Sequence, residues 1–341
     1  MAHLLRLPLR RVAVLSLLPI LLLGCAVLDG LSENGSRASD FPDAGPGGPD
    51  SLYAGIGQSI PWGEWGLDFA DLRAPVTGAI LPVSRATVAA ALRAAQANRV
   101  RLILNLAGAG ANYQNPDGTF NLEMWKARID TYRDVNLAPY VAEGLVLAHF
   151  LMDEPGAEGT WGGQRVSRAV VDSMASYSKS IWPSLPTAVR AAPSWLAAGD
   201  ATYRDLDIGW AQWSGPNRGP SAGTTPEEFR DRNVAYAKRL GLGLVVGLNY
   251  LNGGDGSSGL PGTGDRPGLW QMSAGEIEHA GTVLAGAPYV CAFISWQHEV
   301  GFVSRPDIRP ALDSVARVAA TRSGTTCVRR PLPGDSLAPP D

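Results

Sequence analysis

The chain has 341 residues, of which 45% are hydrophobic and 18% are charged, and its formal net charge at pH 7 is -3. This length and composition allow one large hydrophobic core and exclude a disordered or collagen-like chain. The small net charge and the lack of a Lys/Arg-rich run beyond the first residues argue against nucleic acid as a partner.

The first 24 residues have the pattern of an export signal. Arg6, Arg10 and Arg11 form a positive segment, and the apolar run that follows, 12–23, is too short for a membrane-spanning helix. The run ends in Leu-Leu-Gly-Cys, which resembles the bacterial lipobox, so we expect cleavage before Cys25 and lipidation of that residue. An ordinary signal peptide with an incidental cysteine is the alternative.

Lipidation would attach the mature protein to a membrane, since each buried lipid methylene contributes about 0.8 kcal/mol of membrane affinity. Ala26 after the cysteine, in place of Asp, favours the outer membrane. Residues 25–50 are expected to be a flexible linker, and the Pro-rich residues 323–341 a C-terminal tail. We therefore expect an exported, lipid-anchored monomer with one folded domain over 51–322.

Within 51–322, β-rich apolar segments alternate with helical ones, which is typical of a parallel sheet built from βα units. The expected strands are 53–57, 78–82, 101–106, 145–152, 187–191, 207–212, 244–248 and 289–295. Eight such units in roughly 270 residues match a (β/α)8 TIM barrel, an α/β fold of about 250 residues. An open doubly wound sheet is the alternative, but no G-x-G-x-x-G follows the first strand.

Three helix starts support this alternation, because each has a Ser or Thr with an acidic residue three positions later. The pairs are Thr225 and Glu228, Ser273 and Glu276, and Ser304 and Asp307. We expect a helix to begin at each of them.

Two cysteines, Cys291 and Cys327, remain within or next to the folded domain. The first begins the last expected strand and the second follows the helix that returns to the same end of the barrel, so a disulfide is expected. Two unpaired buried thiols are the alternative. Neither cysteine belongs to a C-x-x-C cluster, and the four histidines form no H-x-H or H-E-x-x-H motif, so no metal or other cofactor is expected.

TIM-barrel active sites are built where the strands end, and the residues at those positions are polar and aromatic here. Indoles in a polar cleft commonly stack on the apolar faces of sugar rings, although some of them can simply plug the barrel mouth. We therefore expect a carbohydrate ligand. The candidate binding residues are Asn105, Arg190, Gln212, Trp213, Asn249, Tyr250, Trp296 and Gln297.

Strand four ends in Leu-Met-Asp-Glu-Pro, and its Asp153, Glu154 and Pro155, together with Trp296 after strand eight, resemble the clan A glycoside hydrolases. In that family strand four commonly ends in Asn-Glu-Pro, whose Glu is the general acid/base, and strand seven supplies a Glu nucleophile. The resemblance implies that Glu154 is the acid/base and that Trp296 stacks on a sugar. Asp153 occupies the Asn position.

Strand seven departs from this pattern, because 243–250 contains no carboxylate and Asn249 stands near the place of the nucleophile. Retaining enzymes need two carboxyl groups about 5 Å apart, and inverting enzymes need them roughly 6.5–9.5 Å apart. Glu299, just past strand eight, is the favoured catalytic partner, although a solvated loop residue is its alternative role. The further candidates are Glu64, Asp255 and Asp265.

Asp153 and Glu154 would point to opposite faces of a regular strand, so both can face the cleft only if the alternation breaks at the strand end. Otherwise one of them caps a helix or forms a structural ion pair with Arg190. The Gly-rich run 252–259 is interpreted as a mobile lid rather than a phosphate site.

Two functions follow from these patterns. The favoured one is a glycoside hydrolase that uses Glu154 as general acid, with Asp153 as tuner or substrate ligand. The alternative is a non-catalytic glycan-binding lipoprotein on the same barrel, which the missing strand-seven Glu favours. Unrelated chemistry stays open, because a fold does not fix a function.

Overall fold

The computed structural model describes residues 59–199, 201–264, 267–323, 325–330 and 332. The expected signal peptide, Cys25, the linker and the first expected strand, 53–57, lie outside the described residues, as does most of the tail. In the part of the chain that is described, no helix is both long and apolar enough to cross a membrane.

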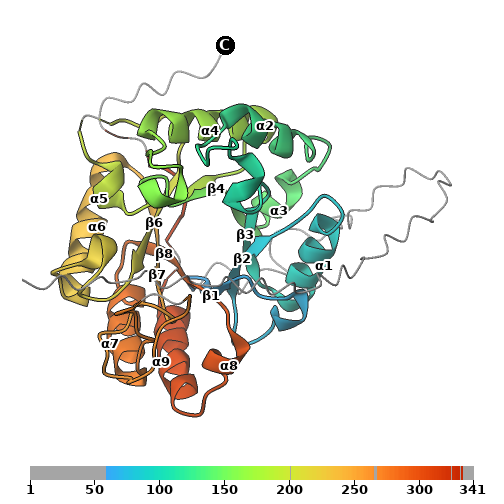
Figure 1. Cartoon of the computed structure of the whole chain (residues 1–341). Helices are drawn as coiled ribbons and strands as arrows, with labels where there is room; N and C mark the ends of the chain where they lie inside the picture. Colours follow the sequence, from blue (N-terminus) through green and yellow to red (C-terminus); the bar gives the residue numbers. More distant parts are fainter. Residues whose placement is uncertain (1–58, 200, 265–266, 324, 331, 333–341) are drawn as a thin grey trace, which may run out of the picture. The chain divides into compact units, whose positions relative to one another are not determined.

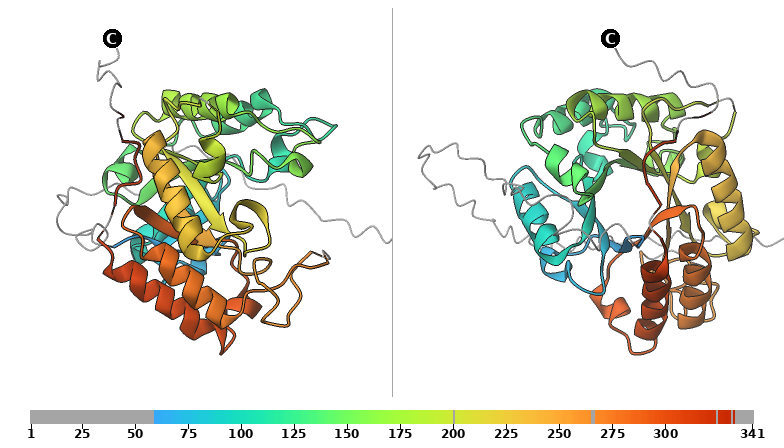
Figure 2. Two further views of the ribbon diagram at one scale, coloured as in Figure 1. Left: turned by 90° about the vertical axis from the view of Figure 1, so that its left-hand side faces the viewer. Right: turned by 180° about the vertical axis from the view of Figure 1, so that it is seen from behind.

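Eight parallel strands, paired in chain order with β8 returning to β1, form a closed barrel (Figure 1), which confirms the predicted TIM barrel. The strands are β1 (Trp62–Trp65), β2 (Gly78–Pro82), β3 (Arg101–Asn105), β4 (Val146–Asp153), β5 (Thr187–Arg190), β6 (Ile208–Trp213), β7 (Gly243–Leu248) and β8 (Val290–Ser295). The helices are α1 (Val88–Asn98), α2 (Leu122–Asp130), α3 (Ala138–Ala142), α4 (Arg168–Ile181), α5 (Pro193–Leu196), α6 (Pro226–Leu240), α7 (Ala274–Ala285), α8 (Val300–Val303) and α9 (Ile308–Thr321). The helices surround the strands in both further views (Figure 2).

Seven expected strands are confirmed with bounds that shift by at most one residue, but the first is wrong. The barrel uses Trp62–Trp65, which pairs with β2 on one side and with β8 on the other. This four-residue segment, Trp-Gly-Glu-Trp, places two strand-favouring tryptophans around Gly and Glu, which are depleted in strands, so its own propensity marks it only weakly. Its two neighbours in the barrel impose the extended conformation.

Apolar side chains pack on both faces of the strands, inside the barrel and outside it. The barrel interior is filled by a separate cluster whose large members include Ile80, Ile103, Phe150 and Trp210. The outer faces of the strands pack against the helices. The interior layer closes the barrel below the strand ends, so a ligand can bind only above it.

Two of the three expected helix starts are confirmed. α6 and α7 begin with complete capping boxes, at Thr225 with Glu228 and at Ser273 with Glu276. The third is wrong, because α9 begins only after Asp307, which makes no side-chain cap. Its carboxylate accepts hydrogen bonds from Arg305 instead.

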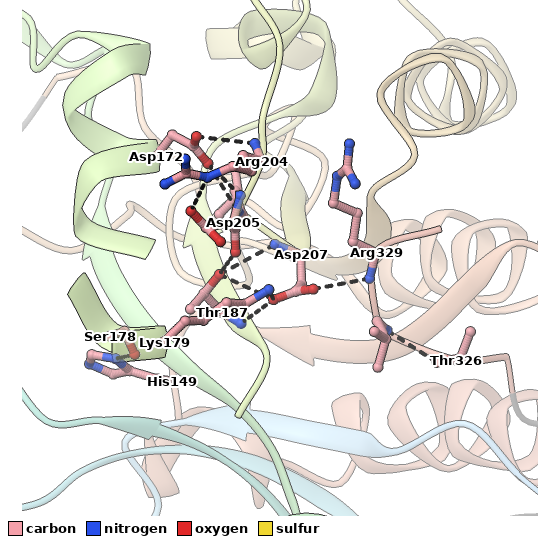
Figure 3. A network of polar contacts seen from close by, with 12 residues as sticks. His149, Asp172, Ser178, Lys179, Thr187, Arg204, Asp205, Asp207, Thr326 and Arg329 are labelled. Atoms are coloured by element: carbon pink, nitrogen blue, oxygen red, sulfur yellow. Dashed lines mark hydrogen bonds and ion pairs between the residues drawn. The ribbon is translucent and has the colours of Figure 1, made fainter. Parts of the chain in front are cut away.

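The N-terminal end of the barrel is closed by covalent and polar contacts. Cys291 of β8 and Cys327 form the expected disulfide, with a Cα–Cα distance of 5.2 Å. Close by in the fold, buried Asp207 accepts hydrogen bonds from the Thr187 amide (2.9 Å) and the Arg329 amide (3.2 Å; Figure 3). It also forms an ion pair with Lys179 (2.9 Å). These contacts tie the chain after α9 to the start of β6, opposite the end that carries the cleft.

His149, in the middle of β4, also belongs to the structural core. It is buried between β4 and α4, where its Nδ1 lies 2.8 Å from Ser178 Oγ (Figure 3). Burial lowers the pKa of His149 to about 3, so its ring is neutral at physiological pH. It does not reach the cleft.

Candidate active site

A cleft opens at the C-terminal ends of the strands. It has two parts of about 380 and 350 Å³, which share Glu154, Arg190, Arg218 and Asn249 as lining residues and are therefore continuous. The first part is further lined by Trp195, Trp210, Gln212 and Ser214, and the second by Asn252, Thr263, Trp296 and Gln297. A cleft of this size, with aromatic walls and a few polar groups, is typical of a small-molecule or oligosaccharide site.

Arg190, at the end of β5, is the ionic centre of the cleft floor, and only 8% of its side chain is exposed. It donates to both carboxylate oxygens of Asp153, one of them at 2.7 Å, and to Gln212 Oε1 at 2.5 Å. Its guanidinium lies 4.7 Å from the ring centroid of Trp296. Burial opposes the charge, but the carboxylates of Asp153 and Glu154 outweigh it and raise the pKa of Arg190. The cation is thereby fixed in place.

Glu154 and Asp153 both face Arg190, because the regular alternation of β4 breaks. The register of β4 against β5 shifts between Phe150 and Asp153. Asp153 takes the two-point contact, whereas Glu154 Oε1 lies 3.5 Å from Arg190 Nη2 and 55% of its side chain is exposed. Asp153 therefore forms the structural ion pair that was the alternative for one of the two acids, and Glu154 is left to contact a ligand.

The backbone of Glu154 is held in an unusual conformation, with φ at +39°. Its amide donates to Arg190 O (3.0 Å), and its carbonyl accepts from Trp161 Nε1 (3.0 Å). Apart from the helix-ending Arg99, it is the only residue other than glycine with a positive φ in the described ranges. Such a conformation costs on the order of 1–3 kcal/mol and persists where the surroundings enforce it, as they often do at functional sites.

Two tryptophans form the aromatic walls. Trp195 of α5 lines the first part of the cleft, and the Arg168 guanidinium lies 4.5 Å from its ring centroid. A Cβ on Gly156 would lie 2.6 Å from Trp195 Nε1, so a glycine is required there. Trp296 lines the second part and packs against Trp65, with ring centroids 5.2 Å apart. Each part of the cleft thus has one partly exposed indole.

Of the predicted binding residues, five line the cleft and three do not. Those that line it are Arg190, Gln212, Asn249, Trp296 and Gln297. Trp213 is displaced because Gln212, next to it on β6, points inward, so Trp213 points outward and packs on Phe229 of α6, with ring centroids 5.4 Å apart.

Tyr250 and Asn105 are the other two exceptions. Tyr250 is fully buried and stacks on Phe302 of α8, at 5.8 Å between ring centroids. Asn105, at the end of β3, is also buried, and its side-chain oxygen accepts from the Gly108 amide at 2.9 Å. Both side chains hold the loops around the cleft rather than lining it.

The expected catalytic partner, Glu299, is a helix cap. Its carboxylate accepts hydrogen bonds from the amides of Gly301 (3.0 Å) and Phe302 (2.6 Å) at the start of α8. This role resembles the solvated alternative more than the catalytic one. Its placement in the cleft was wrong, because it lines neither part.

The remaining carboxylates lie elsewhere as well. Buried Glu64 accepts from His298 Nδ1 at 2.5 Å, and this hydrogen bond, against the opposing effect of burial, raises the pKa of His298. Asp255 accepts from the Ser257 amide at 2.7 Å in the loop before α7. Asp265 lies outside the described residues. Among the described residues, Glu154 is the only carboxylate that lines the cleft.

Among the cleft-lining residues that the sequence did not place among the candidate binding residues are two tryptophans and an arginine, Trp195, Trp210 and Arg218. Trp210 shares the inward parity of Gln212, so alternation along β6 was a usable signal for it. Trp195 also follows a strand end, but nothing in its local sequence distinguishes it from the other tryptophans. Arg218 lies in the middle of a loop, where periodicity gives no information.

No protein-family model matches the chain, and no curated protein matches it either. The fold resembles solved structures of glycoside hydrolases. A beta-glucanase from Saccharophagus degradans is 11% identical, with 77% of this chain and 88% of that chain covered and a TM-score of 0.48. An endocellulase from Pyrococcus horikoshii is 13% identical (76% and 92% covered, TM-score 0.48), and the endoglucanase of Xanthomonas campestris pv. campestris is 11% identical (77% and 94% covered, TM-score 0.46).

At these identities the likeness concerns the fold, and the barrel itself is defined by the pairing of its own strands. The residues of the cleft must therefore carry any functional conclusion. In the described part of the chain, no three His, Cys, Asp or Glu side chains are grouped so that they could hold a metal ion.

Proposed function

We propose that this protein acts on a carbohydrate bound in the cleft, as a glycoside hydrolase with Glu154 as general acid. The observation that carries the proposal is the conformation of Glu154, whose backbone is held at φ +39° while its half-exposed carboxyl group lines both parts of the cleft. Glu154 is the only carboxylate among the described residues that lines the cleft. A strained backbone at such a position is typical of a functional site, so we infer that the strain places this group for function.

The other residues have supporting roles in this proposal. Trp195 and Trp296 stack on sugar rings in the two parts of the cleft, while Asn249 and Gln297 bind hydroxyl groups. The Glu154 carboxyl group donates its proton to the glycosidic oxygen as the bond from that oxygen to the anomeric carbon breaks. A water molecule then bonds to the anomeric carbon and gives a proton back to the Glu154 carboxylate. General acid catalysis of this kind contributes typically 10²–10⁴-fold in rate.

A second candidate function is glycan binding without cleavage. It is favoured by the absence of a second carboxylate among the described cleft-lining residues, since hydrolysis in the two-carboxylate mechanism needs one. Asn249 stands at the end of β7 where a nucleophile would be expected, and Asp265, which lies outside the described residues, directly follows the cleft-lining Gly264 in sequence.

Reducing-end release from a panel of oligosaccharides tests the two functions. We expect Glu154→Gln to lower the rate by about 10²–10⁴-fold. The control is Glu158→Gln, which removes an equally exposed carboxylate that pairs with Arg165 outside the cleft and should keep full activity. A parallel Asp265→Asn variant tests whether that residue is the partner group. Binding without turnover by the unaltered chain would overturn the hydrolase and leave the second function.

We also propose that the chain is exported and anchored through a lipid on Cys25, on the basis of the lipobox resemblance alone. Expression of the full chain in a bacterial host, followed by membrane fractionation, tests the anchor. The unaltered chain should sediment with membranes, and Cys25→Ser should release it or leave it unprocessed. Equal sedimentation of both would contradict lipidation at this residue.

A further inference from the structure

Arg218 is a second cationic side chain in the cleft, and it lines both parts. Arg190 is neutralised by Asp153, but within the described ranges no carboxylate lies within ion-pair distance of Arg218. Its Nη1 nitrogen is shielded from solvent and has no hydrogen-bond partner among the described residues. A shielded guanidinium nitrogen without a hydrogen-bond partner is unfavourable in the free protein, so it points to a ligand that supplies an acceptor, and an anionic acceptor binds a guanidinium most strongly.

The loop that carries Arg218 is held by specific contacts. Ser221, fully buried, donates its hydroxyl to Gly215 O (2.6 Å) and accepts from the Ser214 amide (3.1 Å), which closes the loop on itself. At Gly215, with φ at +82°, a Cβ would lie 2.4 Å from Gly253 O, so the loop also packs closely on the loop after β7. Arg218 is therefore presented to the cleft by a fixed backbone.

The charges around the cleft define what the ligand must supply. Asp153 and Glu154 both face Arg190, the first through a two-point ion pair and the second at 3.5 Å. Among the described residues, no carboxylate lies within ion-pair distance of Arg218. A guanidinium binds a carboxylate through two parallel hydrogen bonds, and this pairing is stronger than a hydrogen bond to a neutral hydroxyl group.

We propose that Arg218 binds the carboxylate of an acidic sugar, so that the ligand of the cleft is a uronate-containing glycan. This inference rests on the proposed carbohydrate function and specifies its substrate class. A hydrogen bond to a charged group corresponds to about 10- to 100-fold in affinity. The preference for an acidic over a neutral glycan should have this size and should weaken as salt is added.

Isothermal titration calorimetry of the full chain tests the inference with matched pairs of ligands. Oligosaccharides of the galacturonate, glucuronate and mannuronate series are each compared with their carboxyl-reduced, neutral counterpart. We expect at least one uronate to bind about 10- to 100-fold more tightly than its reduced form. Arg218→Gln should remove this difference, so that the acidic and the reduced forms bind equally, whereas Arg218→Lys should keep part of it.

Arg230→Gln is the matched control, because Arg230 lies on α6, pairs with Asp231 and does not line the cleft. It should keep the full preference for the uronate. Equal binding of acidic and neutral forms would overturn the inference while leaving the carbohydrate function standing, and so would equal weakening of both by Arg218→Gln. If neither acidic nor neutral glycans bind the unaltered chain, the proposed function itself fails.

Discussion

The adjacent acids Asp153 and Glu154 should respond very differently when each is converted to its amide. Asp153→Asn removes the two-point partner of Arg190, whose side chain is only 8% exposed. Breaking a buried ion pair costs about 3–5 kcal/mol, and because Asp153 is 35% exposed we expect a smaller loss of about 2–3 kcal/mol. Glu154→Gln removes one 3.5 Å contact of a 55% exposed side chain, so its cost should be about 0–1 kcal/mol.

Thermal unfolding followed by circular dichroism measures this difference directly. For a domain of this size, about 2–3 °C of melting temperature corresponds to each kcal/mol, so Asp153→Asn should melt about 4–9 °C lower and Glu154→Gln no more than about 3 °C lower. Activity or glycan affinity should show the reverse order, with Glu154→Gln the more damaging change. Equal destabilisation by the two variants, or a larger effect at Glu154, would refute the assignment of Asp153 as the structural partner.

Three further predictions concern stability. Asp207→Asn should lower the free energy of unfolding in urea by about 3–5 kcal/mol, because it leaves the partly buried Lys179 ammonium and two amides with a weaker acceptor, and a loss below about 1 kcal/mol would contradict this. Cys291→Ser or Cys327→Ser should cost about 4 kcal/mol, as expected for a disulfide that spans 36 residues, and reductant should then have no further effect on melting. The hydrogen bond that His298 donates to Glu64 raises the pKa of His298, so the stabilisation from this pair is complete below pH about 6.5 and is lost as pH rises through the folded-state pKa. His298→Gln should therefore flatten the decline in melting temperature above that pH, and an unchanged slope would contradict it.

The barrel was predictable because seven of its strands are apolar runs separated by helical ones. This alternation is typical of a parallel sheet built from βα units. The first strand escaped prediction since Trp62–Trp65 is specified by its neighbours, not by its own residues. Within the site, inward and outward positions follow from alternation. Applying it along β6 separates Gln212, which lines the cleft, from Trp213, which packs under α6.

Loops set the limit of the sequence prediction. Glu299 is close to a strand end, but its carboxylate is used by two amides of α8, which no spacing rule reveals. Arg218 reaches the cleft only because Ser221 closes its loop and Gly215 allows close packing on Gly253. Similarly, Asp153 and Glu154 share Arg190 because β4 shifts register, an irregularity that depends on its pairing with β5.

The account depends most on the claim that the cleft holds a glycan with Glu154 beside the bond to be cleaved. A crystal structure of the Glu154→Gln chain with a bound oligosaccharide tests it most directly. The account predicts sugar rings on Trp195 and Trp296, with a glycosidic oxygen within about 3 Å of the side chain at position 154. An oligosaccharide bound outside this cleft, or one whose glycosidic oxygens all point away from that side chain, would contradict it.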